Sequence, residues 1–213
     1  MADTITADGK YIWRQASEND VEYEMYKLCE KLEIHEIPKY YETREGLDRL
    51  DYISGSVLRH CGNANYNQVA SLVSWLKKYQ DKLGDALGGK VYVHGALDND
   101  AVLFENDEIK GIVNWQYCGI GEKLEDFVDI LINWLDIGSS IRKNDVIYST
   151  IVKLLNEYGA TEEMRNNLPS LMKEELERRI HSLDKDAWNY EYWYEYYRHA
   201  QTFLELYGER MKG

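Results

Sequence analysis

The sequence VYVHGALDNDAVLFENDEIKGIVNWQYCGIGEKLED, residues 91–126, decides how the whole chain is interpreted. Its three short apolar runs are bounded by turn-forming residues, which is typical of β-strands: residues 91–93, 101–104 and 109–113. Side chains placed just after buried strands are held rigidly, and phosphate or metal chemistry is often positioned in this way. Here the first loop carries Ala96 and Ala101, and the second carries Asn114. The stretch therefore has the layout of a catalytic core from which the reactive side chains are missing.

The length and composition fit a compact, mainly helical protein. The chain has 213 residues, of which 44% are apolar, and this is enough for a single core or for a small lobe joined to a larger one. Only two prolines, Pro38 and Pro169, accompany long apolar patterns of helical period. We expect two tightly coupled lobes with a small strand component.

The net charge of −13 limits the classes of partner. Nonspecific nucleic-acid binding needs a basic surface and is excluded, whereas a cationic small molecule or a basic protein would be attracted; solubility alone explains the charge equally well. The three cysteines lack a metal-binding spacing and indicate reduced thiols in a cytoplasmic protein. No stretch is long and apolar enough to span a membrane, and the N-terminus lacks the apolar core of a signal peptide.

The first part of the chain predicts a small α+β lobe. Ala7-Asp8-Gly9 predicts a hairpin turn, and Ser17 resembles the N-cap of a helix that ends near Leu32. After Pro38, two runs have strand character around a polar turn: residues 40–42 and 50–53. We place the N-terminal lobe at residues 1–55 and the second lobe at residues 56–213.

The second lobe is predicted to be helical outside the opening stretch. Apolar residues recur at helical spacing in several segments: residues 69–83, 124–135, 146–155 and 161–180, and a last helix from residue 188. Gly84, Gly88 and Gly89 would end the first of these helices. The last helix is crowded with tyrosine and tryptophan, which together with Glu191 and Glu195 could line a pocket for a cation. We favour core on one side and a protein interface on the other, because the aromatic area exceeds what one small pocket can use.

Two motifs in the opening stretch resemble those of the aminoglycoside phosphotransferase and choline kinase-like superfamily. HGALDNDAVL, residues 94–103, is similar to that family's His-Gly-Asp-Leu-His-x-x-Asn-Val-Leu, and GIVNW, residues 111–115, to its Gly-Val-Ile-Asp-Trp. The resemblance implies a protein-kinase-like α+β fold: a reduced N-terminal α+β lobe and a larger, mainly helical C-terminal lobe whose short strands carry the catalytic-loop motifs. It also implies that residues 46–55 form the strand that leads into the hinge, where the backbone of Asp51, Tyr52 and Ile53 would hold adenine.

The chain departs from the family at the positions that carry the chemistry. Phosphoryl transfer needs a carboxylate for the acceptor hydroxyl and oxygen ligands for Mg²⁺. By position, Ala96 stands where the catalytic Asp belongs, Ala101 at the metal-binding Asn and Asn114 at the metal-binding Asp. Loss of one positioned base lowers a rate by about 10²–10⁴. ATP and Mg²⁺ are therefore implied for an active relative, while we expect no cofactor and negligible kinase activity for this sequence.

Other residues match the family's framework. His94 and Asp126 match positions that brace the catalytic loop, and we interpret both as structural. Arg14 stands where a strand lysine or arginine would face phosphates, with Glu24 as its helix partner and Glu22 as a weaker candidate. Solvated surface charges explain Arg14 and Glu24 equally well. No glycine-rich loop precedes this strand, because only thirteen residues come before Arg14.

Three hypotheses for function remain open. The leading one is a catalytically impaired, pseudokinase-like or inactivated phosphotransferase that acts by binding a ligand or a protein; natural decay and deliberate inactivation both explain its missing groups. The second is an active small-molecule kinase that uses Asp98 or Asp100, although Asp-Asn-Asp is also ordinary loop sequence. The third is a structural assembly protein that forms a homo-oligomer.

Overall fold

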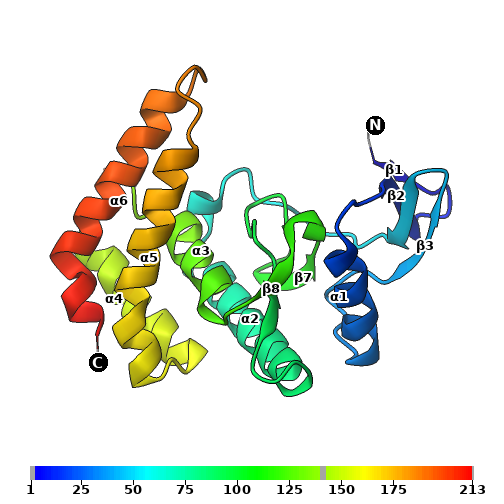
Figure 1. Cartoon of the computed structure of the whole chain (residues 1–213), viewed down its shortest axis with the longest axis horizontal. Helices are drawn as coiled ribbons and strands as arrows, with labels where there is room; N and C mark the ends of the chain where they lie inside the picture. Colours follow the sequence, from blue (N-terminus) through cyan, green and yellow to red (C-terminus); the bar gives the residue numbers. More distant parts are fainter. Residues whose placement is uncertain (1–2, 140–142, 213) are drawn as a thin grey trace.

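The computed structural model describes residues 3–139 and 143–212 and has a small sheet-containing lobe beside a larger helical lobe (Figure 1). The small lobe holds a four-stranded antiparallel sheet in the order β1-β2-β4-β3. Its elements are β1 (Thr4–Ile5), β2 (Tyr11–Gln15), α1 (Asp20–Lys31), β3 (Tyr40–Arg44) and β4 (Leu47–Asp51). Helix α1 lies between the sheet and the second lobe (Figure 1).

Local sequence explains most of the small lobe, with two corrections. The hairpin at Gly9 forms as predicted, with Gly9 at a φ of +67°. The N-cap of α1 is Asn19 instead of Ser17, because the Asn19 side chain accepts the backbone N–H of Val21 while the Ser17 hydroxyl accepts that of Asn19. Strand β4 begins at Leu47, earlier than the predicted residue 50. The turn before it is short, because Glu45 and Gly46 both adopt positive φ and reverse the chain there.

In the described residues, the second lobe contains four short strands, two 3₁₀ turns and five long helices. The short elements lie around the predicted catalytic loop. The elements of the lobe are η1 (Cys61–Asn63), α2 (Tyr66–Ala86), β5 (Val91–Val93), β6 (Val102–Glu105), β7 (Glu108–Ile112), η2 (Trp115–Tyr117), β8 (Gly119–Gly121), α3 (Leu124–Trp134), α4 (Asn144–Tyr158), α5 (Glu162–Ser182) and α6 (Tyr190–Met211). Strand β5 pairs with β8, and β6 pairs with β7. All the predicted strands and helices are present. Gly84 lies inside α2, which continues to Ala86, so it does not end the helix.

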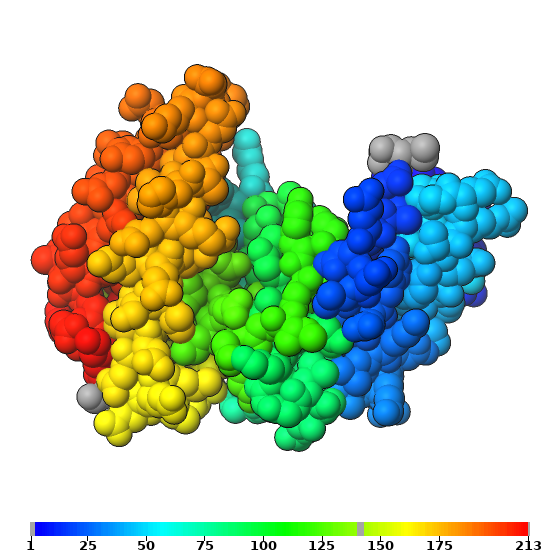
Figure 2. Space-filling model, in the orientation of Figure 1, coloured from blue at the N-terminus to red at the C-terminus, as the bar shows by residue number. Residues whose placement is uncertain are grey.

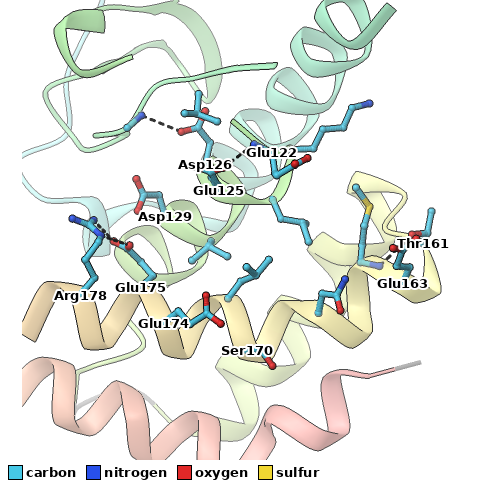
Figure 3. A pocket seen from close by; sticks show the side chains of 18 of the residues that line it. Glu122, Glu125, Asp126, Asp129, Thr161, Glu163, Ser170, Glu174, Glu175 and Arg178 are labelled. Atoms are coloured by element: carbon cyan, nitrogen blue, oxygen red, sulfur yellow. Dashed lines mark hydrogen bonds and ion pairs between the residues drawn. The ribbon is translucent and has the colours of Figure 1, made fainter. Parts of the chain in front are cut away.

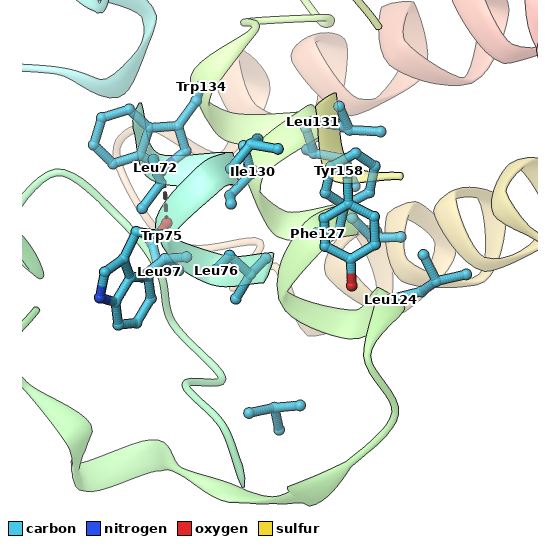
Figure 4. Close-up of a cluster of buried hydrophobic side chains, with 14 of the residues drawn as sticks. Leu72, Trp75, Leu76, Leu97, Leu124, Phe127, Ile130, Leu131, Trp134 and Tyr158 are labelled. Atoms are coloured by element: carbon cyan, nitrogen blue, oxygen red, sulfur yellow. Dashed lines mark hydrogen bonds between the residues drawn. The ribbon is translucent and has the colours of Figure 1, made fainter. Parts of the chain in front are cut away.

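The core of the second lobe lies between α2 and α3 (Figure 4). Trp134, Phe127 and Leu76 are fully buried there, and the ring of Phe127 stacks on Tyr158 with centroids 4.6 Å apart. Trp134 also donates its indole N–H to the carbonyl of Leu97 at 2.9 Å, the hydrogen bond drawn in Figure 4. The core therefore holds the loop between β5 and β6 directly, which fixes the backbone of the candidate site.

Helices α5 and α6 form an antiparallel pair at the outer edge of this lobe (Figures 1 and 2). Tyr196 of α6 is 7% exposed and donates its hydroxyl to the carbonyl of Ile132 in α3. Trp188 and Tyr192, near the start of α6, are exposed instead. One side of the aromatic helix is thus core, as expected. Among the described helices, none has the length and apolar character needed to cross a membrane.

Candidate functional site

Asp126 of α3 closes the loop that follows β5. Its carboxylate accepts the backbone N–H of His94 at 3.0 and 2.9 Å and that of Gly95 at 3.3 Å. Burial raises the pKa of Asp126 to about 7, and the two backbone donors act against this shift. Gly95 adopts a φ of +77°, and a Cβ there would lie 2.6 Å from the carbonyl oxygen of Tyr117. Only glycine therefore fits this turn without strain.

His94 joins the ends of β5 and β7 through its ring. Nε2 donates to the carbonyl of Val113 at 2.8 Å, and Nδ1 accepts the backbone N–H of Ala96 at 3.3 Å. These two bonds require the neutral ring with its proton on Nε2, and burial lowers the pKa of His94 to about 4. The ring also packs on Trp115 with centroids 4.6 Å apart. His94 and Asp126 thus brace the loop from two directions, with Asp126 bound to the backbone of His94 and not to its ring.

Ala96, Ala101 and Asn114 each stabilise the structure of this loop. Ala101 is fully buried, and its carbonyl accepts the backbone N–H of Val113 at 2.9 Å. Asn114 has a left-handed backbone with a φ of 64° and donates its side-chain amide to the carbonyl of Asp100 at 3.1 Å. A carboxylate at position 114 could not make that donation. Ala96 is half-buried and bonds to His94 through its backbone.

Asp98 and Asp100 are exposed residues of the same loop, and the carboxylate of each accepts a hydrogen bond from within the loop. The carboxylate of Asp98 accepts the backbone N–H of Asp100 at 3.1 Å, and that of Asp100 accepts the side-chain amide of Asn99 at 2.9 Å. Partial burial of its carboxyl, together with the charge of Asp100, raises the pKa of Asp98. No group of three or more His, Cys, Asp or Glu side chains in the described chain is arranged to hold a metal ion.

In the small lobe, Arg14 is held by two buried carboxylates. It forms an ion pair with Glu22 of α1, and its Nη2 lies 3.6 Å from the carboxylate of Asp48 on β4. Asp48 is the residue directly opposite Arg14 across the two strands, and both carboxylates are fully buried. Tyr26 donates to the same Glu22 oxygen at 2.9 Å. The cluster carries two negative charges and one positive charge.

Of the two predicted partners of Arg14, Glu24 is wrong, and the weaker candidate, Glu22, forms the ion pair. Glu24 is exposed, whereas Glu22 and Tyr26 lie one helical turn apart on the side of α1 that faces the sheet. Because each residue of a helix turns by about 100°, Glu24 points away from Glu22 by about 200°. The alternative of solvated charges is correct for Glu24 but not for Arg14, whose side chain is 13% exposed.

The predicted hinge follows β4. The backbone N–H groups of Asp51 and Tyr52 are bonded to the carbonyls of Lys39 and Lys10, both at 2.9 Å. Ser56 exchanges two backbone hydrogen bonds with Phe104 of the second lobe. Within the part of the chain that the structure describes, residues 53–55 make no backbone hydrogen bond. Of the three residues expected to hold adenine, Ile53 alone has an N–H group with no hydrogen-bond acceptor among the described residues.

Structural comparison identifies the architecture. The chain superposes on an aminoglycoside phosphotransferase from Alicyclobacillus acidocaldarius with a TM-score of 0.67 at 9% identity, covering 98% of this chain and 89% of that one. The gentamicin complex of APH(2")-IIa gives 0.55 at 13%, covering 96% and 85%. The chain has the fold of the aminoglycoside phosphotransferases. Choline kinase LicA from Streptococcus pneumoniae gives 0.50 at 12%, covering 95% and 88%. No family model matches the sequence, and no curated protein matches it.

Mg²⁺ and ATP, which the phosphotransferase fold implies, do not fit the residues present. The buried methyl of Ala101 offers no metal ligand, and the amide of Asn114 is directed as a donor at the Asp100 carbonyl. Arg14, which would face phosphates, is neutralised by Glu22 and Asp48 with one negative charge to spare. A triphosphate would meet net repulsion at this cluster.

A cleft of about 1170 Å³ opens beside the catalytic loop, between α3 and α5 (Figure 3). Seven carboxylates line it against two cations, and they come from both walls: Glu122, Glu125, Asp126, Asp129, Glu163, Glu174 and Glu175 against Lys123 and Arg178. Gly95, next to Ala96, also lines it. The sequence analysis did not predict this cleft. The feature of the sequence that could have indicated it is the presence of acidic residues in two separate helices.

Five of the seven carboxylates of this cleft fall into two groups. Asp129 pairs with Arg179, and Glu175 pairs with both Arg178 and Arg179. The Arg179 guanidinium bridges α5 to α3 and also donates to Asn133 at 2.7 Å. Glu125, Glu163 and Glu174 are exposed, and in the described chain no ion pair joins them to a cation. The first group holds the wall in place, while the second leaves uncompensated negative charge facing the cleft.

Proposed function

We propose that this chain binds a cationic small molecule in the cleft between α3 and α5 and does not transfer phosphate to it. The observation that carries the proposal is a set of carboxylates on opposite walls of the cleft that form no ion pair in the described chain: Glu125, Glu163 and Glu174. Of these, Glu125 also accepts the backbone N–H of Glu122 at 2.7 Å. A ligand with several amines would pair with carboxylates on both walls, and its desolvation would be offset by these contacts. Solved structures of the same fold include a complex with gentamicin, a polyamine, which agrees with this choice of ligand.

The absence of transfer is supported by the loop itself. Ala96 has no lone pair to accept a proton, and neither Ala101 nor Asn114 presents a carboxylate to a metal. Asp98 and Asp100 are bonded within the loop, so their use as a base would require it to rearrange. The impaired phosphotransferase thus keeps a binding cleft and lacks the chemistry.

Calorimetric titration with gentamicin, and separately with choline, tests the proposal. We expect gentamicin to bind, and Glu125→Gln with Glu174→Gln to weaken binding by about tenfold or more, since each lost charge contact removes about 1 kcal/mol. Glu108→Gln is the matched control, because Glu108 is an exposed glutamate on β7 outside the cleft.

Two results would contradict the proposal. Binding that is equally strong in the double variant would move the ligand out of the cleft. Mg²⁺-dependent consumption of ATP that is lost in Asp98→Ala or Asp100→Ala would show a working kinase with a relocated base.

A further inference from the structure

The turn between α5 and α6 exposes aromatic side chains that the core does not use. This turn lies at an extremity of the molecule (Figures 1 and 2). Trp188 in it is 95% exposed, and Tyr192 in the first turn of α6 is 58% exposed. Farther along α6, by contrast, Ala200 and Phe203 are buried. We call Trp188, Tyr192 and the acidic residues around them the aromatic tip.

Elsewhere in the chain, two arginines each lie over a pair of tyrosine rings. Arg49 lies over the rings of Tyr11 and Tyr41 at 4.7 and 5.1 Å from their centroids. Arg210 lies over Tyr148 and Tyr207 at 4.5 and 5.0 Å. Across residues 3–139 and 143–212, no lysine or arginine lies over Trp188 or Tyr192. The Tyr192 ring contacts Trp193 and Tyr196. The exposed surfaces of Trp188 and Tyr192 are thus available to a guanidinium group from outside the described chain, in the way that Arg49 and Arg210 lie over rings within it.

The charge around these rings has one predominant sign. Within residues 184–195, four exposed carboxylates accompany these rings in the sequence against one exposed cation: Asp184, Asp186, Glu191 and Glu195 against Lys185. Helical spacing places Glu191, Tyr192 and Glu195 on one face of α6. Within the described residues, no ion pair engages any of the four carboxylates. A planar cation could stack on a ring and pair with a neighbouring carboxylate at the same time.

We propose that the aromatic tip docks an arginine-bearing basic segment of a partner protein. A guanidinium both stacks on indole and forms paired hydrogen bonds to a carboxylate, which a lysine ammonium cannot do. An anionic membrane surface would be repelled by the surplus of carboxylates at the tip. A second copy of the chain would bring an equally acidic tip and a net charge of −13 with it.

The test uses the full-length protein and a ten-residue peptide of alternating arginine and glycine at 0.15 M salt. We expect the indole N–H resonance of Trp188, assigned by its loss in Trp188→Phe, to shift on titration while the buried Trp115 and Trp134 signals stay in place. Trp188→Ala with Tyr192→Ala should weaken binding at least tenfold. A peptide with lysine in place of arginine should bind several times more weakly.

Tyr117→Ala is the matched control, because Tyr117 is a 67% exposed tyrosine outside the tip. It should leave peptide affinity unchanged. Equal binding to the double variant would place the peptide elsewhere, for instance in the acidic cleft, and would overturn the proposal. So would equal affinity for the arginine and lysine peptides, or binding of phosphatidylserine vesicles with no peptide binding.

Discussion

At the scale of single residues, His94 and Asp126 carry opposite dependences of stability on pH. Burial raises the pKa of Asp126 to about 7, so between pH 4 and 7 the folded state holds a proton that the unfolded state has lost, and stability falls as pH rises. Burial lowers the pKa of His94 to about 4, so between pH 4 and 6.5 the unfolded state binds the extra proton, and stability rises with pH. The two contributions offset each other over this range.

Replacing either His94 or Asp126 should reveal the pH dependence of stability that the other residue contributes. Asp126→Asn should lower the unfolding free energy relative to wild type, and this loss should shrink as pH rises from 4.5 to 6.5. The loss caused by His94→Gln should grow over the same range. Each loss should change by up to about 1.4 kcal/mol per pH unit. Urea unfolding at a series of pH values measures both. A constant difference for either variant would mean that the residue does not change its protonation on folding.

At the scale of elements, α1 is fastened to the second lobe at both ends. Asn19 caps the helix and donates its side-chain amide to the carbonyls of Gln116 at 3.2 Å and Cys118 at 2.8 Å. At the other end, Lys82 of α2 donates to the carbonyls of Leu32 and Glu33. The small lobe is therefore held against the segment that follows Asn114.

Asn19→Asp separates the two roles of this residue. Aspartate is as good an N-cap, but it loses both donor bonds and places a charge beside two carbonyl oxygens, so we expect a loss of about 1–3 kcal/mol in unfolding free energy and faster amide exchange in α1. Asn65→Asp is the control, because Asn65 caps α2 and its amide bonds only to Asp107, which belongs to the same lobe. Equal losses in both variants would show that the bonds between the lobes contribute nothing.

The sequence predicted secondary-structure elements and local motifs better than it predicted the ion-pair partners of charged residues and the position of the cleft. The motif at residues 94–103 and the helical periods rest on neighbours in the chain, and they located β5 to β7 and all six long helices. The partner of Arg14 depended on which side of α1 is buried, and that side carries Glu22 and Tyr26 while Glu24 is exposed. The acidic cleft depended on α3 meeting α5, since Glu125 and Glu174 are distant in sequence and only tertiary packing makes them neighbours.

At the scale of the whole molecule, phosphoryl transfer would require groups from both lobes to converge on one nucleotide. The second lobe lacks the base and the metal ligands at positions 96, 101 and 114. In the first lobe, Arg14 is neutralised by Glu22 and by Asp48, which also accepts hydrogen bonds from Thr43 and Tyr23. The three positions in the second lobe are therefore not the only features that would oppose nucleotide binding.

Restoring the second lobe should thus fail to restore activity. We expect the triple variant Ala96→Asp, Ala101→Asn and Asn114→Asp to show no Mg²⁺-dependent ATP binding by calorimetry and no transfer to gentamicin. Asp48→Asn in the triple background removes the surplus charge beside Arg14 while keeping a hydrogen-bond acceptor, and nucleotide binding should strengthen in that variant only. Phosphoryl transfer by the triple variant with Asp48 intact would show that the cluster around Arg14 tolerates a nucleotide and that the three positions alone separate this chain from an active enzyme.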